Sequence, residues 1–272
     1  MPVHDELGKR MKSYYENISK TKLMRRTPVI IRIDGKAFHT FTKGFQKPFD
    51  EILVKTMQDT TKYLCENIQG CVFGYTQSDE ITLVLVDYKK LNSEAWFDYE
   101  VQKMCSIAAS MATMAFNKFF KKCFINWQDE CVNMAYMGTL SDEEIDWSNI
   151  IAKTYQDAIE KGAMFDARCF NIPKEEVVNC VYWRQIDATR NSIQMVGQAN
   201  FSHNELHKKT CNMIQEMLHE QKGINWNDYP TYLKRGSAVK KDESGQWIID
   251  LDMPILKGEN RDYLEKLIMV GE

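Results

Sequence analysis

The sequence predicts an α+β fold whose core elements follow the order strand, helix, strand, strand, helix, strand. Four short runs rich in β-branched and aromatic residues have the composition of buried strands. They lie at residues 28–34, 71–76, 80–87 and 168–173. Two longer stretches, 48–67 and 93–121, carry apolar residues at helical spacing. We therefore expect an antiparallel βαββαβ sheet with helices on one face and a helical C-terminal part.

The predicted catalytic domain covers residues 1–200 and contains an insertion. Residues from about 126 to 165 are expected to be loop-rich, with one short helix at 148–161. Pro173 closes the fourth strand and opens a helix over 174–195. The helices and strands outside the insertion are expected to form one continuous domain.

Segments at both ends of the chain extend this domain. An amphipathic helix is expected at 5–20. The C-terminal extension, 201–272, should contain a helix at 203–220 and two strands at 237–241 and 246–250. We expect this helical and hairpin extension to pack on the same domain.

Composition limits the classes of protein that the chain can be. Among its 272 residues the formal net charge is -3, which argues against binding of nucleic acid by bulk charge but permits a basic face. The eight cysteines form no C-x-x-C pair, so reduced thiols are expected rather than disulfides or a zinc site. No signal peptide or membrane span is apparent, and we expect a cytoplasmic protein without a membrane partner.

Two aspartates follow or precede strands that should be neighbours. Asp34 ends the first strand and Asp79 precedes the third, and these strands lie side by side and antiparallel in a βαββαβ sheet. Paired carboxylates repel each other unless a cation joins them, and Mg²⁺ prefers such oxygen ligands. Gly35 would let the backbone approach a metal or phosphate closely. The pattern indicates catalytic carboxylates around two Mg²⁺ ions that act on a phosphate.

Basic side chains near the pair suit a triphosphate. Lys36, His39, Lys47 and Lys103 can supply positive charge or hydrogen bonds to it. A D-G after a strand and an S-D-E in a hairpin are also common as simple turns. From the residues alone, a metal site at Asp34 and Asp79 and two ordinary turns are equally good interpretations.

Four sequence blocks resemble those of the tRNA(His) guanylyltransferase family. They are RIDGKAFHTF at 32–41, KPFD at 47–50, YTQSDEI at 75–81 and WRQID at 183–187. The resemblance extends over about residues 27–236. The blocks around RIDG and QSDE together are highly specific for this family. It implies a polymerase-palm fold and 3′-to-5′ addition of nucleotides to the 5′ end of tRNA, either as guanylate addition to tRNA(His) or as 5′-end repair.

The resemblance also implies roles for particular residues. Asp34, the Gly35 backbone and Asp79 would hold the two Mg²⁺ ions. Glu80 would support the second metal ligand from behind rather than bind metal itself. The nucleotide, which is GTP, ATP or another NTP, would contact Asp34, Gly35, Lys36, Ala37, Phe38, His39, Ser78 and Asp79. A homotetramer is implied as well.

The region after WRQID departs from the family pattern. Eukaryotic-type members carry H-I-N-N-L-Y-N there, whereas this chain has TRNSIQM at 189–195 and retains Asn191. Thr189 stands in place of the histidine, and threonine cannot carry the charge or ring hydrogen bonds of an imidazole. The departure favours template-directed repair of truncated tRNA 5′ ends over strict guanylate addition to tRNA(His).

Contacts with tRNA are expected from the WRQID block with the run after it, and from basic side chains elsewhere. The block would contribute Trp183, Arg184, Gln185, Asp187 and Asn191. A helix with a packed Trp183 and a solvated Arg184 is the competing interpretation. Phosphate contacts, or merely a solvated face, are expected at Lys118, Lys121, Lys122, Lys208, Lys209, Lys234 and Arg235. His203 and His207 are interpreted as a surface helix face rather than metal ligands.

Two other classes of function remain open. A palm enzyme of the nucleotide cyclase kind would use the same carboxylates on a free nucleotide. A non-catalytic RNA-binding module needs exposed aromatic residues on its middle strands, and residues 80–87 offer aliphatic ones instead.

Overall fold

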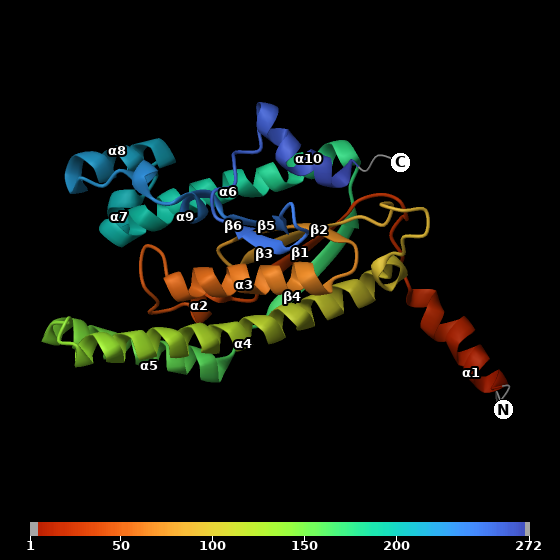
Figure 1. Ribbon diagram of the computed structural model, residues 1–272, viewed down its shortest axis with the longest axis horizontal. Coiled ribbons are helices and arrows are strands. Elements are labelled where there is room, and N and C mark those ends of the chain that lie inside the picture. Colours follow the sequence, from red (N-terminus) through yellow and green to blue (C-terminus); the bar gives the residue numbers. More distant parts are fainter. Residues whose placement is uncertain (1–4, 270–272) are drawn as a thin grey trace.

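A six-stranded antiparallel sheet forms the centre of the protein in the computed structural model, which describes residues 5–269 (Figure 1). The strand order is β4-β1-β3-β2-β5-β6. The strands are β1 (Val29–Gly35), β2 (Cys71–Gln77), β3 (Glu80–Leu85), β4 (Phe165–Asn171), β5 (Ser237–Lys241) and β6 (Trp247–Asp250). The predicted α+β class is confirmed, and the C-terminal hairpin β5-β6 extends the same sheet.

The register of β1 on β3 decides which side chains share a face. Ile33 lies opposite Ile81 and Asp34 lies opposite Glu80, so the two strands are antiparallel neighbours as predicted. Side chains alternate between faces along each strand. Asp34 and Glu80 therefore lie on the opposite face from Ile33.

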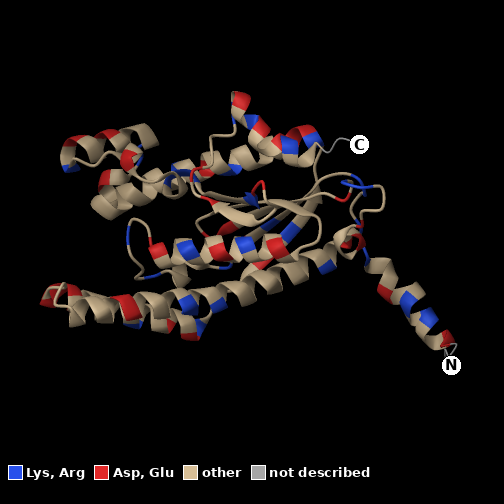
Figure 2. Ribbon diagram, in the orientation of Figure 1, with Lys and Arg blue, Asp and Glu red and all other residues tan. Residues whose placement is uncertain are grey.

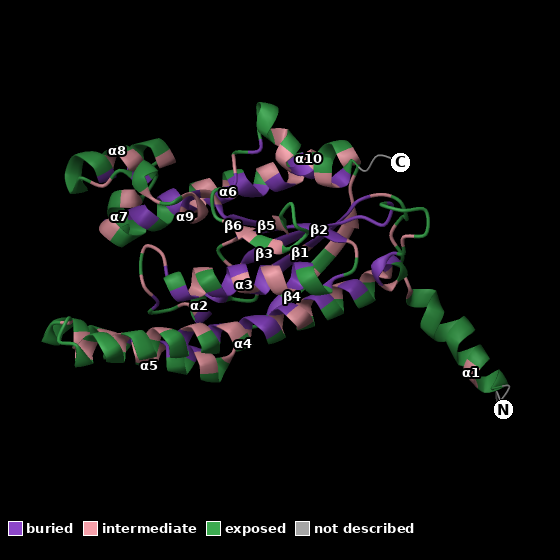
Figure 3. Cartoon of the chain, viewed as in Figure 1, coloured by how far each residue is buried: buried purple, intermediate pink, exposed green. Residues whose placement is uncertain are grey.

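Two helices, α3 (Glu51–Asn67) and α4 (Val101–Tyr136), cover the face to which Ile33 belongs. Helix α5 (Asp142–Lys161) packs alongside α4. Phe38, Phe41, Phe116 and Phe120 form an aromatic cluster between α4 and the loop after β1. Burial of each such ring stabilises the fold by about 1.5–3 kcal/mol. Figure 3 shows the buried residues concentrated where these elements meet the sheet.

The other face is covered by α6 (Lys174–Asn200) and α10 (Asp262–Ile268). Val177 and Val181 of α6 pack in one buried cluster with Ile30 and Val84 of the sheet. The two helices of the βαββαβ unit, α3 and α4, thus share one face as predicted. The helix after β4 and the end of the chain occupy the opposite face.

The insertion is helical, so the expectation of a loop-rich segment at 126–165 was wrong. Helix α4 continues to Tyr136, and α5 begins at Asp142 after a capping box in which Ser141 and Glu144 bond reciprocally. Trp127 on α4 packs edge-to-face on Tyr155 of α5, with ring centroids 5.5 Å apart. No residue from 126 to 150 is buried, which explains why apolar periodicity is weak in that part of the insertion.

Two other predicted helices have different limits. Helix α4 begins at Val101 rather than near residue 93, because Phe97, Asp98 and Tyr99 adopt left-handed conformations. The helix predicted at 203–220 is divided into α7 (His203–Leu206) and α8 (Cys211–Lys222).

The peripheral segments are short or project from the body. Helix α1 (Glu6–Met11) continues as helical turns to Ser19, projects away from the sheet and buries none of its residues. Helices α2 (Phe38–Phe41) and α9 (Thr231–Arg235) flank the sheet edge. Within residues 5–269 no helix combines the length and apolar character that crossing a membrane would require.

Asp50 links the start of α3 to α5. Its buried carboxylate accepts hydrogen bonds from the backbone N–H of Leu53 (2.9 Å) and of Gln46 (3.0 Å) and from the hydroxyl of Tyr155 (2.7 Å). We predict that Asp50→Ala lowers the free energy of unfolding by about 2–4 kcal/mol. The substitution removes the N-cap of α3 and leaves the donors that bonded to Asp50 without an acceptor. Urea denaturation measures this loss. Tyr155→Phe removes only one of these bonds and should cost less; equal losses would contradict the assignment.

Candidate functional site

Two carboxylates meet at one edge of the sheet. Asp34 is near the end of β1, and Asp79 lies in the turn between β2 and β3. The backbone N–H of Gly35 donates to the backbone oxygen of Asp79 over 3.1 Å, and Asp34 lies opposite Glu80. The topology therefore brings together residues that are 45 positions apart in the sequence.

The charges of this pair are poorly compensated by the chain. Burial raises the pKa of Asp79 above its ordinary value, and the charge of Asp34 adds to the rise. The Ser78 hydroxyl donates to Asp79 Oδ1 over 3.0 Å and opposes the rise in pKa. Within residues 5–269 no lysine or arginine forms a salt bridge with Asp34 or Asp79. Two carboxylates that no lysine or arginine side chain neutralises are suited to bind a divalent cation such as Mg²⁺, which prefers oxygen ligands.

The backbone beside both carboxylates is strained. Ala37 (φ 51°) and Ser78 (φ 49°) adopt left-handed conformations, which cost roughly 1–2 kcal/mol each for residues other than glycine. A Cβ added at Gly35 would overlap the ring of Phe38. Strain of this kind is typical of functional sites, where the surrounding structure holds an unfavourable backbone in place.

A cleft of about 500 Å³ opens beside the carboxylates. Most of the predicted nucleotide-binding residues line it: Gly35, Ala37, Phe38, His39, Lys47, Ser78 and Asp79. The ring of Phe38 is nevertheless largely buried against Phe116 and Phe165 and forms the cleft's floor. Lys36 is exposed in the loop between Gly35 and Ala37. The cleft has the size of a nucleotide-binding site.

Lys103 does not reach this cleft, so its assignment to the nucleotide was wrong. The hydroxyl of Thr113 on α4 accepts a hydrogen bond from the Phe165 backbone at the carboxylate edge of the sheet. Lys103 lies ten residues nearer the helix N-terminus, roughly 15 Å away along the axis. Its ammonium group instead lies 4.7 Å from the ring centroid of Phe97.

Several lining residues of the cleft were not identified from the sequence. They are Thr42, Phe45, Gln46, Asp50, Met195 and Gln198. Asp50 belongs to the KPFD block, which could have identified it. Met195 and Gln198 come from α6, and only the packing of that helix over the sheet brings them here.

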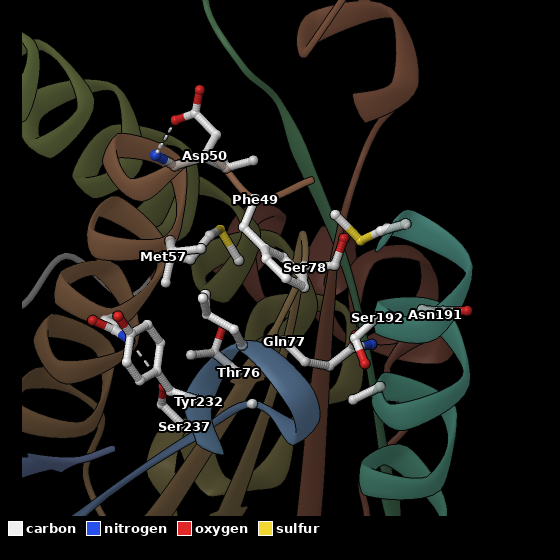
Figure 4. Close-up of a pocket in the computed structure, with 17 residues that line it drawn as sticks. Phe49, Asp50, Met57, Thr76, Gln77, Ser78, Asn191, Ser192, Tyr232 and Ser237 are labelled. Atoms are coloured by element: carbon white, nitrogen blue, oxygen red, sulfur yellow. Dashed lines mark hydrogen bonds between the residues drawn. The ribbon is translucent and has the colours of Figure 1, made fainter. Parts of the chain in front are cut away.

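A smaller, more apolar cavity of about 80 Å³ adjoins the cleft (Figure 4). Phe49, Met57 and Tyr232 form apolar parts of its wall, and Asn191 and Ser192 contribute polar groups from α6. Ser78 and Asp50 line both cavities. Asn191, predicted to contact tRNA, therefore lines a cavity that adjoins the cleft beside Asp79.

Glu80 is held by two arginines. Its oxygens accept from Arg184 Nε (2.6 Å) and Nη2 (2.7 Å), and Arg32 Nη2 lies 2.8 Å from Oε1. Arg184 also contacts Asp187 over 2.7 Å. The ring of Trp183 covers both guanidinium groups. The carboxylate of Glu80 is thus bonded within the protein to two arginines, and its role behind metal ligands stays a prediction.

Three residues expected to contact tRNA have their side chains inside the protein. Arg184 is only 6% exposed. Its side chain is therefore not available to RNA, as the first interpretation expected, and it is not solvated, as the competing interpretation expected. Gln185 is 2% exposed and bonds to the backbone of Pro254 and Leu256. Lys234 is buried and donates to the backbone oxygen of Asn227.

The other predicted contacts are accessible. Trp183 is 54% exposed and Asp187 is partly exposed. The lysines on α4 and after α7 are exposed, and Figure 2 shows where charged residues lie along the chain. Arg235 is only partly exposed and its Nε is buried.

We predict that Arg184→Met lowers the free energy of unfolding by about 3 kcal/mol, because it leaves the buried charge of Glu80 short of a partner. Guanidinium chloride titration followed by circular dichroism measures the loss. Arg168→Met is the matched control, since the pair of Arg168 with Asp166 is exposed on both sides. That variant should lose less than about 1 kcal/mol. Similar losses in the two variants would contradict the structural role of Arg184.

The raised pKa of Asp79 predicts a pH-dependent stability. The folded protein holds the proton of Asp79 more tightly than the unfolded chain, so this residue reduces stability as pH rises through the raised pKa. In EDTA at pH 7.5, Asp79→Asn should therefore melt about 2 °C above the wild type. Differential scanning calorimetry at pH 7.5 and pH 4.5 tests this, and the gain should shrink at pH 4.5. A gain that is independent of pH would argue against the titration of Asp79 as its cause.

Comparison with known proteins agrees with this geometry. A family model described as tRNAHis guanylyltransferase matches residues 8–173. The solved structure of a bacterial tRNA(His) guanylyltransferase-like protein in complex with ATP is 38% identical with a TM-score of 0.80, covering 97% of this chain and 100% of that one. A bacterial complex with GTP has the same coverage, 36% identity and a TM-score of 0.73.

A curated relative points to the same family. The tRNA(His) guanylyltransferase of Saccharomyces cerevisiae is 25% identical over 227 residues, which is 78% of this chain and 82% of the yeast protein. The chain belongs to the tRNA(His) guanylyltransferase family and is a nucleotidyltransferase.

Proposed function

We propose that this protein repairs tRNA by template-directed 3′-to-5′ addition of nucleotides to a truncated 5′ end. The observation that carries the proposal is the carboxylate of Asp79, which lines a nucleotide-sized cleft and lies close enough to Asp34 for the charge of Asp34 to raise its pKa. Relatives solved in complex with ATP and with GTP support the identification of the cleft as a nucleotide site.

The proposed metal site consists of Asp34, Asp79 and the backbone of Gly35. Two bound Mg²⁺ ions would supply easier deprotonation of the attacking sugar hydroxyl and neutralisation of the leaving phosphate. The protein's own contribution is positioning. His39 and Lys47 line the same cleft as Asp79 and can bind phosphate oxygens.

Selection of the incoming nucleotide is proposed to come from base pairing with the opposite tRNA strand. By analogy, other enzymes leave sequence choice to pairing while the protein recognises shape and backbone. The cleft therefore has no need of a pocket dedicated to one base.

The conformation of Thr189 supports repair rather than the eukaryotic type of 5′ activation. Its hydroxyl donates to the backbone oxygen of Gln185, one turn earlier in α6, over 3.0 Å. The side chain is therefore bound to its own helix and has no ionisable group to offer a substrate. We propose that a 5′ triphosphate is the preferred end, because it needs no prior activation.

Homotetramer assembly belongs to this proposal through the family resemblance. Helix α1 supports it indirectly, since Leu7, Met11 and Ile18 are exposed at 59%, 41% and 74% on a helix that buries nothing within its own subunit.

The test is extension of a 5′-truncated, triphosphorylated tRNA by labelled GTP and Mg²⁺. We predict that Asp34→Ala and Asp79→Ala each reduce the rate by at least about 10³-fold, because each removes charge stabilisation at the reacting phosphate. Asp59→Ala is the control, since its carboxylate pairs with Lys55 on α3 away from the cleft. Circular dichroism and the melting temperature establish that all variants are folded.

Each outcome of this assay has a distinct meaning. Extension that survives in both variants would exclude the two carboxylates from the reaction. A cyclic nucleotide product would identify a cyclase, and binding of RNA without any chemistry would identify a binding module. Extension of monophosphorylated ends as fast as triphosphorylated ends would contradict the argument from Thr189.

A further inference from the structure

A second hollow continues the catalytic cleft along α6. It has a volume of about 560 Å³ and includes Gln194, Gln198, His203, His207, Lys208 and Lys209 in its lining. Gln198 also lines the catalytic cleft, and Met195, next to Gln194, does so as well. A chain of nucleotides that leaves the carboxylate edge along α6 would therefore enter this hollow, which we call the histidine–lysine hollow.

The histidine–lysine hollow is basic and lacks carboxylates. Lys208 and Lys209 line it, and within residues 5–269 neither forms a salt bridge. The sole acidic residue between positions 201 and 210 is Glu205. Its carboxylate accepts from the backbone N–H (2.7 Å) and hydroxyl (2.6 Å) of Ser202 in the capping box of α7. The positive charge is thus left available for a phosphate.

The shape of the hollow is fixed from below. Phe201, Leu206 and Ile214 form its apolar floor and pack in a small core with Val196 and Trp226. The left-handed conformation of Lys208 (φ 60°) turns the chain directly after α7 and holds the two lysines beside the histidines.

The side chains at the rim have the chemistry of a site for single-stranded nucleic acid. His203 and His207 present exposed rings with centroids 6.3 Å apart. Flat rings can stack on bases, lysines bind phosphates, and glutamine amides such as that of Gln198 can bond base edges. Double-stranded RNA offers no free base faces, so this combination favours unpaired nucleotides.

We propose that the histidine–lysine hollow binds the unpaired 3′ end of the tRNA. This inference rests on the proposed function. If the incoming nucleotide pairs with the opposite strand, that strand must pass beside Asp34 and Asp79. Its nucleotides beyond the templating position have no partner, and the hollow next to the cleft is where they would lie.

The experiment compares two tRNAs that share one truncated, triphosphorylated 5′ end. One retains its unpaired 3′ nucleotides, and the other is trimmed to end at the templating nucleotide. With full-length protein, we predict a KM about five- to tenfold lower for the untrimmed tRNA and similar kcat values, since stacking on about one base gives an effect of this order.

Two double variants remove the hollow's contacts. Lys208→Gln/Lys209→Gln and His203→Ala/His207→Ala should raise the KM for untrimmed tRNA to that for trimmed tRNA. They should raise the KM for the trimmed substrate far less than the KM for the untrimmed one. Lys266→Gln and His219→Ala are matched controls outside the hollow and should keep the wild-type preference. Because all four targeted positions are exposed, melting temperatures should stay within about 2 °C of the wild type.

Other outcomes would overturn the inference. These are equal KM values for the two tRNAs with the wild type, equal weakening of both substrates in the variants, or a change in the KM for GTP, which would indicate a mononucleotide site. No extension of either tRNA would count against the proposed function. Extension of both tRNAs with the same KM would count against binding of the 3′ end in the hollow, but not against the proposed function.

Discussion

The bonding of Glu80 by Arg32 and Arg184 is the interaction on which the functional edge of the sheet depends. Three acidic side chains, Asp34, Asp79 and Glu80, meet where β1 ends and β3 begins. The arginines neutralise Glu80 inside the protein, whereas within residues 5–269 neither Asp34 nor Asp79 forms a salt bridge. A carboxylate pair of this kind is costly to the free protein and useful to an enzyme that handles cations and phosphates.

The same edge also concentrates strain. The left-handed residues Ala37 and Ser78 precede α2 and Asp79, respectively, and the ring of Phe38 leaves no room for a side chain at Gly35. The aromatic cluster beneath the loop is large enough to hold this unfavourable backbone in place. Stability supplied by the core is therefore used locally to keep the backbone beside Asp34 and Asp79 in a fixed arrangement.

The fold could be predicted from the sequence because its strands and long helices carry strong local periodicity, and the βαββαβ order determines which strands are neighbours. The meeting of Asp34 and Asp79 follows from that rule alone. Arg184 could not be placed in the same way, since its partner Glu80 lies 104 positions away and burial of an arginine leaves no local signal. Lys103 was misplaced because the distance along α4 depends on the packing of α4 on β4. The helical character of 126–147 was missed because no residue in that segment is buried, whereas the predicted helix at 148–161 is part of α5.

Helix α4 has a mechanical consequence. Its 36 residues extend about 54 Å, whereas a seven-residue strand extends roughly 23 Å, so much of α4 forms an arm that reaches past the sheet together with α5. Phe116 on this helix touches Phe38, whose ring supports Gly35. One helix therefore carries both the arm and an aromatic ring that packs beneath the loop after β1, so the direction of the arm is fixed relative to that loop by the packing of Phe116 on Phe38.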